Sequence, residues 1–410
     1  MRKLFPTVLA FGVILGSFGI WSCNSSSTSV IEQDTAAVVI AYKQSSINVI
    51  KGVAIVPDTV VSSGGAVKRF SIRPSLPTGL NLDTNTGLIS GTPSAPTAFT
   101  NDTVIATGPT GIDTAIIVLS TPALESVIWT GNQLVAVGNN GVVLTSLNGV
   151  SWTSRYSGTT KNLNDVTWAG SLLVAVGDSG TILVSSDGSA WTNRTSGVTN
   201  PSGTRTIISS ITWTGHQLVA VGYSDAFGGA ILTSPDAIAW VHQSIASPLS
   251  SVAWTGSQLV AVGETPFVST GYPRAQSPIL TSTDGLNWAS QSSNTQSALS
   301  SVTSTNSQLV AVGISGTILT SPDGIAWTSR HSGITSGLNS VNGSGTKLVV
   351  VGYGGAILTS VDGLTWLNQA SGTTNILLSV AWTGDQYATV GDVGTILTSV
   401  DGITWKNSNP

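Results

Sequence analysis

The chain has 410 residues, of which 8% are charged, and a formal net charge of -4 with only 15 lysines and arginines. This length allows two or three domains with a sizeable core. The few cations are scattered, which excludes the basic surface that a nucleic-acid backbone requires.

The amino terminus has the pattern of a secretory signal. Two basic residues precede an apolar run over residues 4–21, and the only cysteine follows at Cys23. A single cysteine in an exported protein cannot form an internal disulfide. Residues 20–23 resemble the lipobox of bacterial lipoprotein signals, although Trp21 stands where a small residue is usual. The resemblance implies that residues 1–22 are a signal peptide and that Cys23 carries a lipid.

Two alternatives remain for this terminus, namely an ordinary signal peptide with an incidental cysteine and an uncleaved membrane anchor. No later apolar run is long enough to span a bilayer. The polar stretch after Cys23 predicts a flexible tether over residues 23–37. Asn24 does not resemble the signal that retains lipoproteins in the inner membrane, which implies an exported protein anchored at the outer membrane or cell surface.

Short β-branched runs separated by turn signals predict a small Ig-like β-sandwich over residues 38–120. The expected strands lie within residues 38–42, 47–57, 67–74, 87–93, 102–108 and 113–120. The segment LPTGLNLDTNTGLISGTP, residues 76–93, resembles the bacterial immunoglobulin-like modules of the He_PIG type. Within it, Asp83 and Gly87 offer an Asx-type turn. The simplest role for this domain is that of a spacer.

Three aspartates of the sandwich raise the question of a calcium site: Asp83, Asp102 and Asp113. A cadherin-like calcium site gathers several oxygen ligands at one place, and no D-x-D-x-D cluster is present. We therefore expect these three aspartates to cap turns, which is a standard role of this residue type.

Residues 121–410 contain seven near copies of one unit, whose most constant part is the box S-x-D-G-x-x-W. The box tryptophans are Trp152, Trp191, Trp240, Trp288, Trp327, Trp366 and Trp405, at steps of 39, 49, 48, 39, 39 and 39 residues. A full unit reads SVxWTGxQLVAVGxxGxILTSxDGxxWTSR, in which Gly-bearing turns separate four β-rich runs. Four strands in about 40 residues are typical of one propeller blade.

The LVAV run in each unit is apolar at every position, so both faces of that strand must be covered, as they are between neighbouring blades. An open β-solenoid is the alternative, but its end repeats would need to differ from the interior. The last repeat is close to the consensus. We therefore predict an all-β chain, with an Ig-like β-sandwich followed by a seven-bladed β-propeller.

The Asp-Gly pair of each box predicts a tight hairpin with glycine at positive φ, and the tryptophan is expected to bury its ring between blades. The motif resembles the Asp-box of sialidase and BNR repeats, although it is one residue shorter. The repeats also resemble the Ycf48-like assembly-factor propellers. Blade 1 has Asn148 in place of the aspartate, and blade 3 has Ala237 in place of the glycine. The aspartates that we interpret as structural are Asp187, Asp236, Asp284, Asp323, Asp362 and Asp401.

A search for catalytic residues finds no convincing constellation. A sialidase needs an arginine triad, but Arg155, Arg194 and Arg330 occupy equivalent positions on the outermost strands. The three histidines occupy unrelated positions, so they predict no metal site. No nucleophile elbow or phosphate-binding loop is present. We predict no cofactor, no metal and no enzyme activity.

Alternating strand directions place the loop between the second and third strands on the face opposite the boxes, together with the loop between blades. All insertions into the 39-residue unit fall in these loops, near residues 198–205, 223–229 and 264–278. The candidate ligand-binding residues there are Arg205, Tyr223, Asp225, Phe227, Glu264, Phe267, Tyr272 and Arg274. Exposed aromatic side chains beside charges suit a protein or glycan contact. The alternative is that long loops merely tolerate insertions.

The same face also carries one variable position in every blade, directly after the glycine that ends the second strand. Its residues are Asn139, Asp178, Tyr223, Glu264, Ile314, Tyr353 and Asp392. The expected function is that of a non-catalytic, monomeric cell-surface lipoprotein whose propeller binds a protein or glycan. The alternatives are a Ycf48-like assembly or chaperone factor and a sialidase-like glycoside hydrolase.

Overall fold

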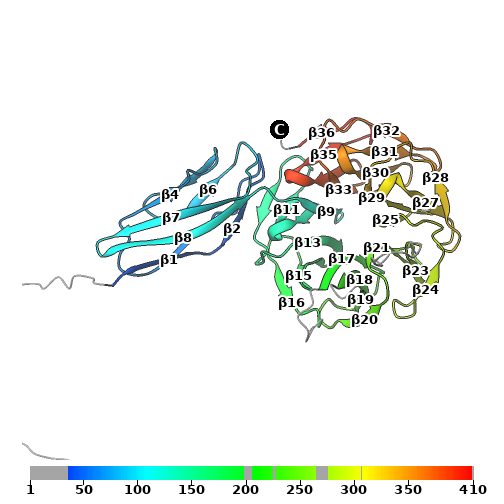
Figure 1. Cartoon of the computed structure of the whole chain (residues 1–410), viewed down its shortest axis with the longest axis horizontal. Coiled ribbons are helices and arrows are strands. Elements are labelled where there is room, and N and C mark those ends of the chain that lie inside the picture. The colour runs from blue at the N-terminus through cyan, green and yellow to red at the C-terminus, as the bar shows by residue number, and fades with distance from the viewer. Residues whose placement is uncertain (1–35, 198–205, 225–227, 265–275, 306, 409–410) are drawn as a thin grey trace, which may run out of the picture. The chain divides into compact units, whose positions relative to one another are not determined.

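The protein is described here by a computed structural model of residues 36–197, 206–224, 228–264, 276–305 and 307–408. The regular elements of these residues are β-strands, with four short 3-10 turns. No helix within them is long and apolar enough to cross a membrane. An Ig-like domain followed by a ring of four-stranded blades confirms the predicted all-β architecture (Figure 1). The predicted signal sequence and Cys23 lie outside the described residues.

The Ig-like domain consists of three small sheets around one apolar core. Its strands are β1 (Val38–Tyr42), β2 (Ser46–Asn48), β3 (Val60–Gly64), β4 (Arg69–Arg73), β5 (Leu80–Leu82), β6 (Ile89–Gly91), β7 (Thr100–Gly108) and β8 (Gly111–Ser120). The largest sheet has the order β2-β8-β7-β4, in which β2 is parallel to β8. The other two sheets are the antiparallel pairs β1-β3 and β5-β6.

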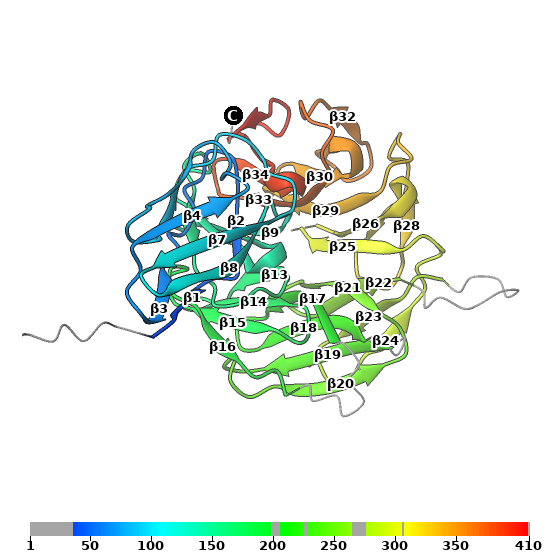
Figure 2. The same cartoon turned by 60° about the vertical axis from the view of Figure 1, so that its left-hand side comes forward.

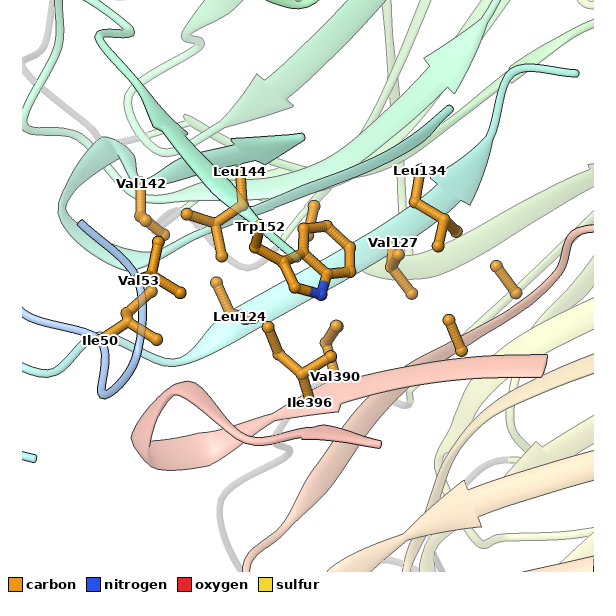
Figure 3. Packing of buried hydrophobic residues seen from close by; sticks show 13 residues of the cluster. Ile50, Val53, Leu124, Val127, Leu134, Val142, Leu144, Trp152, Val390 and Ile396 are labelled. Atoms are coloured by element: carbon orange, nitrogen blue, oxygen red, sulfur yellow. The ribbon is translucent and has the colours of Figure 1, made fainter. Parts of the chain in front are cut away.

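The apolar run over residues 47–57 differs from the prediction, because only its start belongs to a strand. After β2 the chain turns at Gly52, whose φ of 76° lies in the left-handed region that glycine adopts readily. Ile50 and Val53 then pack into a cluster with residues of the propeller, and Figure 3 shows both side chains beside Val142. The run is apolar because its residues pack into two different cores. This continuous apolar pattern is also typical of a longer strand, which explains the prediction.

The three aspartates of the sandwich have different roles. Asp83 caps its turn as expected, because its Oδ1 accepts hydrogen bonds from Asn85 N at 2.8 Å and Thr86 N at 3.1 Å. The same expectation is wrong for Asp102 and Asp113, which lie inside β7 and β8. Asp113 accepts a hydrogen bond from a backbone N–H of β1, and Asp102 is buried, which raises its pKa.

The propeller consists of seven antiparallel sheets of four consecutive strands each. Blades 1 to 3 comprise β9 (Leu124–Trp129), β10 (Leu134–Gly138), β11 (Val143–Ser146), β12 (Thr153–Arg155), β13 (Leu163–Trp168), β14 (Leu173–Gly177), β15 (Ile182–Ser185), β16 (Thr192–Arg194), β17 (Thr206–Trp213), β18 (Leu218–Ser224), β19 (Gly229–Ser234) and β20 (Val241–Ile245). Blades 4 to 7 comprise β21 (Leu249–Trp254), β22 (Leu259–Gly263), β23 (Ile279–Ser282), β24 (Ala289–Gln291), β25 (Leu299–Ser304), β26 (Leu309–Gly313), β27 (Ile318–Ser321), β28 (Thr328–Arg330), β29 (Leu338–Gly343), β30 (Leu348–Gly352), β31 (Ile357–Ser360), β32 (Leu367–Gln369), β33 (Leu377–Trp382), β34 (Tyr387–Gly391), β35 (Ile396–Ser399) and β36 (Lys406–Asn407).

Burial explains why the blades close into a ring. The first strands contact one another around the centre, as Figure 2 shows for β13, β17, β21, β25 and β29. Every residue of the second strands β10, β14, β22, β26, β30 and β34 is buried, as the continuous LVAV pattern predicted. Blade 7 packs against blade 1 in one cluster, where Figure 3 shows Trp152 between Leu144 and Ile396. An open solenoid is therefore wrong.

The serine of the SVxW segment provides a hydrogen-bond acceptor for backbone N–H groups at the inner edges of the blades. Its hydroxyl accepts a hydrogen bond from a backbone N–H on the first strand of the next blade. The bonds are Val252 N to Ser210 Oγ, Val302 N to Ser251 Oγ, Val380 N to Ser340 Oγ and Val127 N to Ser379 Oγ, at 3.4, 3.2, 3.3 and 3.1 Å. The last of these joins blade 7 to blade 1. Unpaired edge N–H groups are thus given partners around the ring.

Candidate functional site

The Asp boxes lie on one face of the propeller, which we call the box face. The polar side chains of each box form hydrogen bonds within their own turn. In blade 5, Asp323 Oδ1 accepts hydrogen bonds from Ile325 N at 2.9 Å and Ala326 N at 3.0 Å. Ser321 Oγ accepts from Gly324 N at 2.8 Å. The same backbone N–H groups hold the pKa of the Asp323 carboxyl below its usual range. The box aspartates are thus turn caps, as predicted.

A second bond locks most boxes to the preceding blade. Gln308 Nε2 donates to Asp362 O at 2.7 Å, and Gln386 Nε2 donates to Asn148 O at 2.9 Å across the closure of the ring. The same pairing recurs between blades 1 and 2, 3 and 4, and 4 and 5, and a lysine replaces the glutamine between blades 6 and 7. Blade 2 has Leu172 at this position. The repetition of the box thus joins neighbouring blades.

Blade 1 offers a natural test of the box, because Asn148 Oδ1 accepts the same two N–H groups, at 2.9 Å each. We expect Asp323→Ala to lower the melting temperature by a few degrees, since two N–H groups lose their acceptor. Asp323→Asn keeps the acceptor and should leave the melting temperature close to that of the wild type. Thermal unfolding followed by circular dichroism checks this, and equal losses in both variants would contradict the capping role.

The structure describes two of the eight predicted ligand-binding residues. Tyr223 is half-buried at the end of β18, where it pairs with Gly229, and Glu264 is exposed directly after β22. The other six lie outside the described residues: Arg205, Asp225, Phe227, Phe267, Tyr272 and Arg274. Tyr223 and Glu264 belong to adjoining blades 3 and 4, on the face opposite the boxes.

The turns between second and third strands define this opposite face, which we call the loop face. Four of these turns are 3-10 turns, η1 (Asn139–Gly141), η2 (Ile314–Gly316), η3 (Tyr353–Gly355) and η4 (Asp392–Gly394). Their first residues differ in exposure, since Ile314 and Tyr353 are 40% and 50% exposed whereas Asp392 is half-buried. Asp178 of blade 2 is buried and accepts a hydrogen bond from Asn162 Nδ2 at 3.1 Å.

Glu125 at the start of β9 is a feature of the loop face that sequence reasoning missed. Burial raises its pKa, and the negative charges of Asp392 and Asp178 raise it further. Burial also raises the pKa of Asp392. The charges of Asp392 in blade 7 and Asp178 in blade 2 thus act on Glu125 in blade 1. The repeats contain a signal for this, because Glu125 is the only charged residue at its repeat position. The other blades have Asn164, Ser209, Ser250, Ser300, Asn339 and Leu378 there.

Chemically, this arrangement brings negative charge from two neighbouring blades to bear on one half-buried carboxyl, that of Glu125. Within the described ranges, no group of three or more His, Cys, Asp or Glu side chains could hold a metal ion. Burial makes ionisation of such a half-buried carboxyl less favourable than it is in water. The loop face thus combines such acids with the exposed side chains of Ile314 and Tyr353.

Val393, in η4, has a strained backbone on the same face. Its φ is 54°, a left-handed conformation that is an outlier for a β-branched residue. The equivalent residue of blade 6 is Gly354, which adopts a φ of 66° without a side chain. Val393 is nevertheless 47% exposed, so its side chain contributes little to the core. Strain of this kind at an exposed position is typical of functional surfaces.

Comparisons with known proteins support the two folds separately. Residues 28–121 match the family described as Putative Ig domain. The crystal structure of the WD40 beta propeller domain of Doa1 is similar to this chain, with a TM-score of 0.51 and 10% identity over 69% of this chain and 95% of that one. Saccharomyces cerevisiae Sqt1 has a TM-score of 0.48 and 9% identity over 70% of this chain and 84% of that one. No curated protein matches this chain. The chain therefore joins an Ig-like domain of that family type to a domain with the β-propeller fold.

Proposed function

We propose that this protein is a non-catalytic, lipid-anchored binding protein of the cell surface, and that its loop face binds a protein or glycan. The proposal includes export of the chain and attachment of the lipid at Cys23, on the pattern of the amino terminus. The Ig-like domain acts as a spacer between the membrane and the propeller.

The contrast between the two faces carries this proposal. On the box face, equivalent residues repeat from blade to blade and bind their own turns and neighbours. On the loop face, equivalent positions hold unrelated side chains, among them exposed Ile314 and Tyr353 and strained Val393. Positions that support the fold are expected to be alike from blade to blade, whereas positions that recognise a ligand are expected to differ. Aromatic side chains often contribute most of the energy of such recognition contacts.

A binding role is favoured over catalysis because the box carboxylates are held in their turns around the ring and do not converge. The acids of the loop face include Glu125, Asp178 and Asp392, and the pKa of Glu125 is raised. A glycoside hydrolase would use such an acid as a proton donor. Loss of glycan hydrolysis in Glu125→Gln would therefore replace the proposal by the hydrolase alternative.

The test uses the full chain, screened on a glycan array and in pull-downs from cell-surface fractions. We expect a captured ligand to be lost with Phe267→Ala/Tyr272→Ala and weakened by Tyr353→Ala, while the wild-type fold is kept. The matched control is Ile325→Ala, because Ile325 is an exposed aliphatic residue of the box face. Cys23→Ser should release the protein from the membrane without changing ligand binding.

Two results would contradict the proposal. Full binding by the loop-face variants together with loss of binding in Ile325→Ala would assign recognition to the box face. Membrane retention and palmitate labelling of Cys23→Ser would remove the lipid anchor from the proposal. Capture of a membrane complex under assembly, rather than of a mature surface ligand, would favour the assembly-factor alternative.

A further inference from the structure

A cavity of about 300 Å³ lies where the Ig-like domain meets blade 1. One wall is the segment from Lys43 to Asn48, which includes β2. The other is formed by the turn at Asn140 and by residues 154–161, which run from β12 into the loop after it. This volume is at the lower limit of small-molecule sites and suits a single sugar ring. The cavity borders the turn η1 of the loop face but shares no residue with the insertions of blades 3 and 4, so it can be tested separately from the function proposed above.

Hydrogen bonds tie the two walls of the cavity to each other and to the Ig-like domain. Asn48 Nδ2 donates to Asn140 O at 3.3 Å, and Asn140 Nδ2 donates to Ser120 Oγ at 2.9 Å. Gln44 N donates to Oδ1 of the buried Asp58 at 3.1 Å, which holds the β1–β2 connection. Residues 36–410 form one compact unit. The cavity is thus part of a packed interface.

The charge of the cavity is the first sign of a ligand. Lys43, Arg155 and Lys161 line it, and no carboxylate is among its lining residues. The whole chain has only 15 lysines and arginines and a net charge of -4. Three cations around one small cavity in such a chain create a local positive potential that attracts an anion.

Unused polar groups and an aromatic ring are the second sign. Ser46 and Asn48 line the cavity, and within the described residues Ser46 Oγ and Asn48 Oδ1 are buried without a hydrogen-bond partner. Buried polar atoms are normally paired, so these two invite an external donor or acceptor. Tyr156 is 44% exposed, and Lys43 Nζ lies 5.9 Å from the centre of its ring. Hydroxyl groups, an amide and an aromatic face are what a sugar needs.

Blade 6 shows that the hollow itself is a feature of the repeat, whereas its charge is not. The equivalent hollow there is lined by Gln369 and Ala370 in place of Arg155 and Tyr156, and no charged residue lines it. In blade 6, Asn375 stands at the position of Lys161 in blade 1, directly after the lining residue Thr374. Blade 1 differs from blade 6 in combining the hollow with cations and with a wall from the Ig-like domain.

We propose that this cavity binds an anionic sugar, with its carboxylate or sulfate held by Arg155 and the two lysines. A guanidinium matches the planar geometry of a carboxylate and pairs with it through two hydrogen bonds. Ser46 and Asn48 then bind sugar hydroxyls, and Tyr156 covers one face of the ring.

The repeats provide a substitution that should leave the fold intact. Arg155 Nε donates to Thr145 Oγ1 at 3.0 Å, and in blades 4 and 6 the equivalent bond is made by Gln291 and Gln369, at 2.9 Å each. Arg155→Gln therefore keeps a structural bond that two other blades make naturally. The matched control is Arg330→Gln, because Arg330 makes the same bond in blade 5, at 2.8 Å, away from the Ig-like domain.

The experiment titrates the full chain with glucuronate, glucose and inorganic sulfate in millimolar amounts, followed by ligand-observed NMR. We expect glucuronate to bind and glucose not to bind. Arg155→Gln should weaken glucuronate binding by about ten- to a hundredfold, whereas Arg330→Gln should leave it unchanged. Competition by sulfate would show that the anion occupies the same place.

Equal affinity in both glutamine variants, or no binding of glucuronate by the wild type, would overturn the proposal. Binding of sulfate without glucuronate would also overturn it, because the cavity would then take a free oxyanion and no sugar. These outcomes are distinct from failure of the loop-face proposal, whose variants lie in blades 4 and 6 and leave the cavity residues unchanged.

Discussion

Trp327→Ala is expected to lower the free energy of unfolding by about 3–5 kcal/mol, the range for truncation of a buried aromatic side chain. Trp327 is 5% exposed and packs at the seam between blades 4 and 5, in a cluster with Val260 and Leu319. Its Nε1 also donates to Gly324 O at 2.9 Å. Urea unfolding followed by fluorescence of the remaining tryptophans measures the change.

Phenylalanine substitutions separate packing from the hydrogen bond in this prediction. Trp327→Phe keeps an aromatic ring but leaves Gly324 O without its donor, so we expect a smaller loss of about 1 kcal/mol. Trp240 is the matched control, because its Nε1 has no hydrogen-bond partner in the part of the chain that the structure describes. Trp240→Phe should therefore be closer to neutral. A neutral Trp327→Ala would show that the ring does not stabilise the seam.

Asp165→Ala is expected to destabilise the propeller by about 2–4 kcal/mol, because several donors would lose one shared acceptor. Asp165 Oδ1 accepts from Ser126 Oγ at 2.8 Å and from Val166 N at 2.9 Å, and its Oδ2 accepts from Ile211 N at 2.8 Å. Burial raises the pKa of this carboxyl, while these donors lower it. One side chain thus connects blades 1, 2 and 3.

The control for Asp165 comes from the ring itself. Ser210, Ser251, Ser340 and Ser379 hold the equivalent position and accept one N–H of the next blade. Asp165→Ser should therefore recover much of the stability that Asp165→Ala loses. The seam between blades 2 and 3 also lacks the glutamine bond, because Leu172 packs there against Ala237. Equal unfolding free energies for the alanine and serine variants would contradict a bridging role of Asp165.

The repeated unit determined the propeller by itself, because its information is local. The LVAV strand and the SxDGxxW turn each lie within 39 residues, and their burial and hydrogen bonds follow from that spacing. The last repeat has nearly the same apolar pattern as the interior repeats, so its outer face also needs a neighbouring blade. In a closed ring, that neighbour is the first repeat. The structure shows this closure in the bond from Gln386 to Asn148. Ring closure was therefore predictable from sequence.

Contacts between residues distant in sequence were decided only by the tertiary structure. Aspartate is a common turn residue, yet Asp102 and Asp113 lie inside β7 and β8 of the sheet. The charge of Asp392 acts on Glu125 because the ring closes between blades 7 and 1. Arg155 repeats in blade 5 as Arg330, and only the packing of Ile50 and Val53 onto blade 1 gives it a second wall. The sequence of a repeat determines which side chains its surface carries. Which distant segment contacts that surface depends on how the whole chain folds.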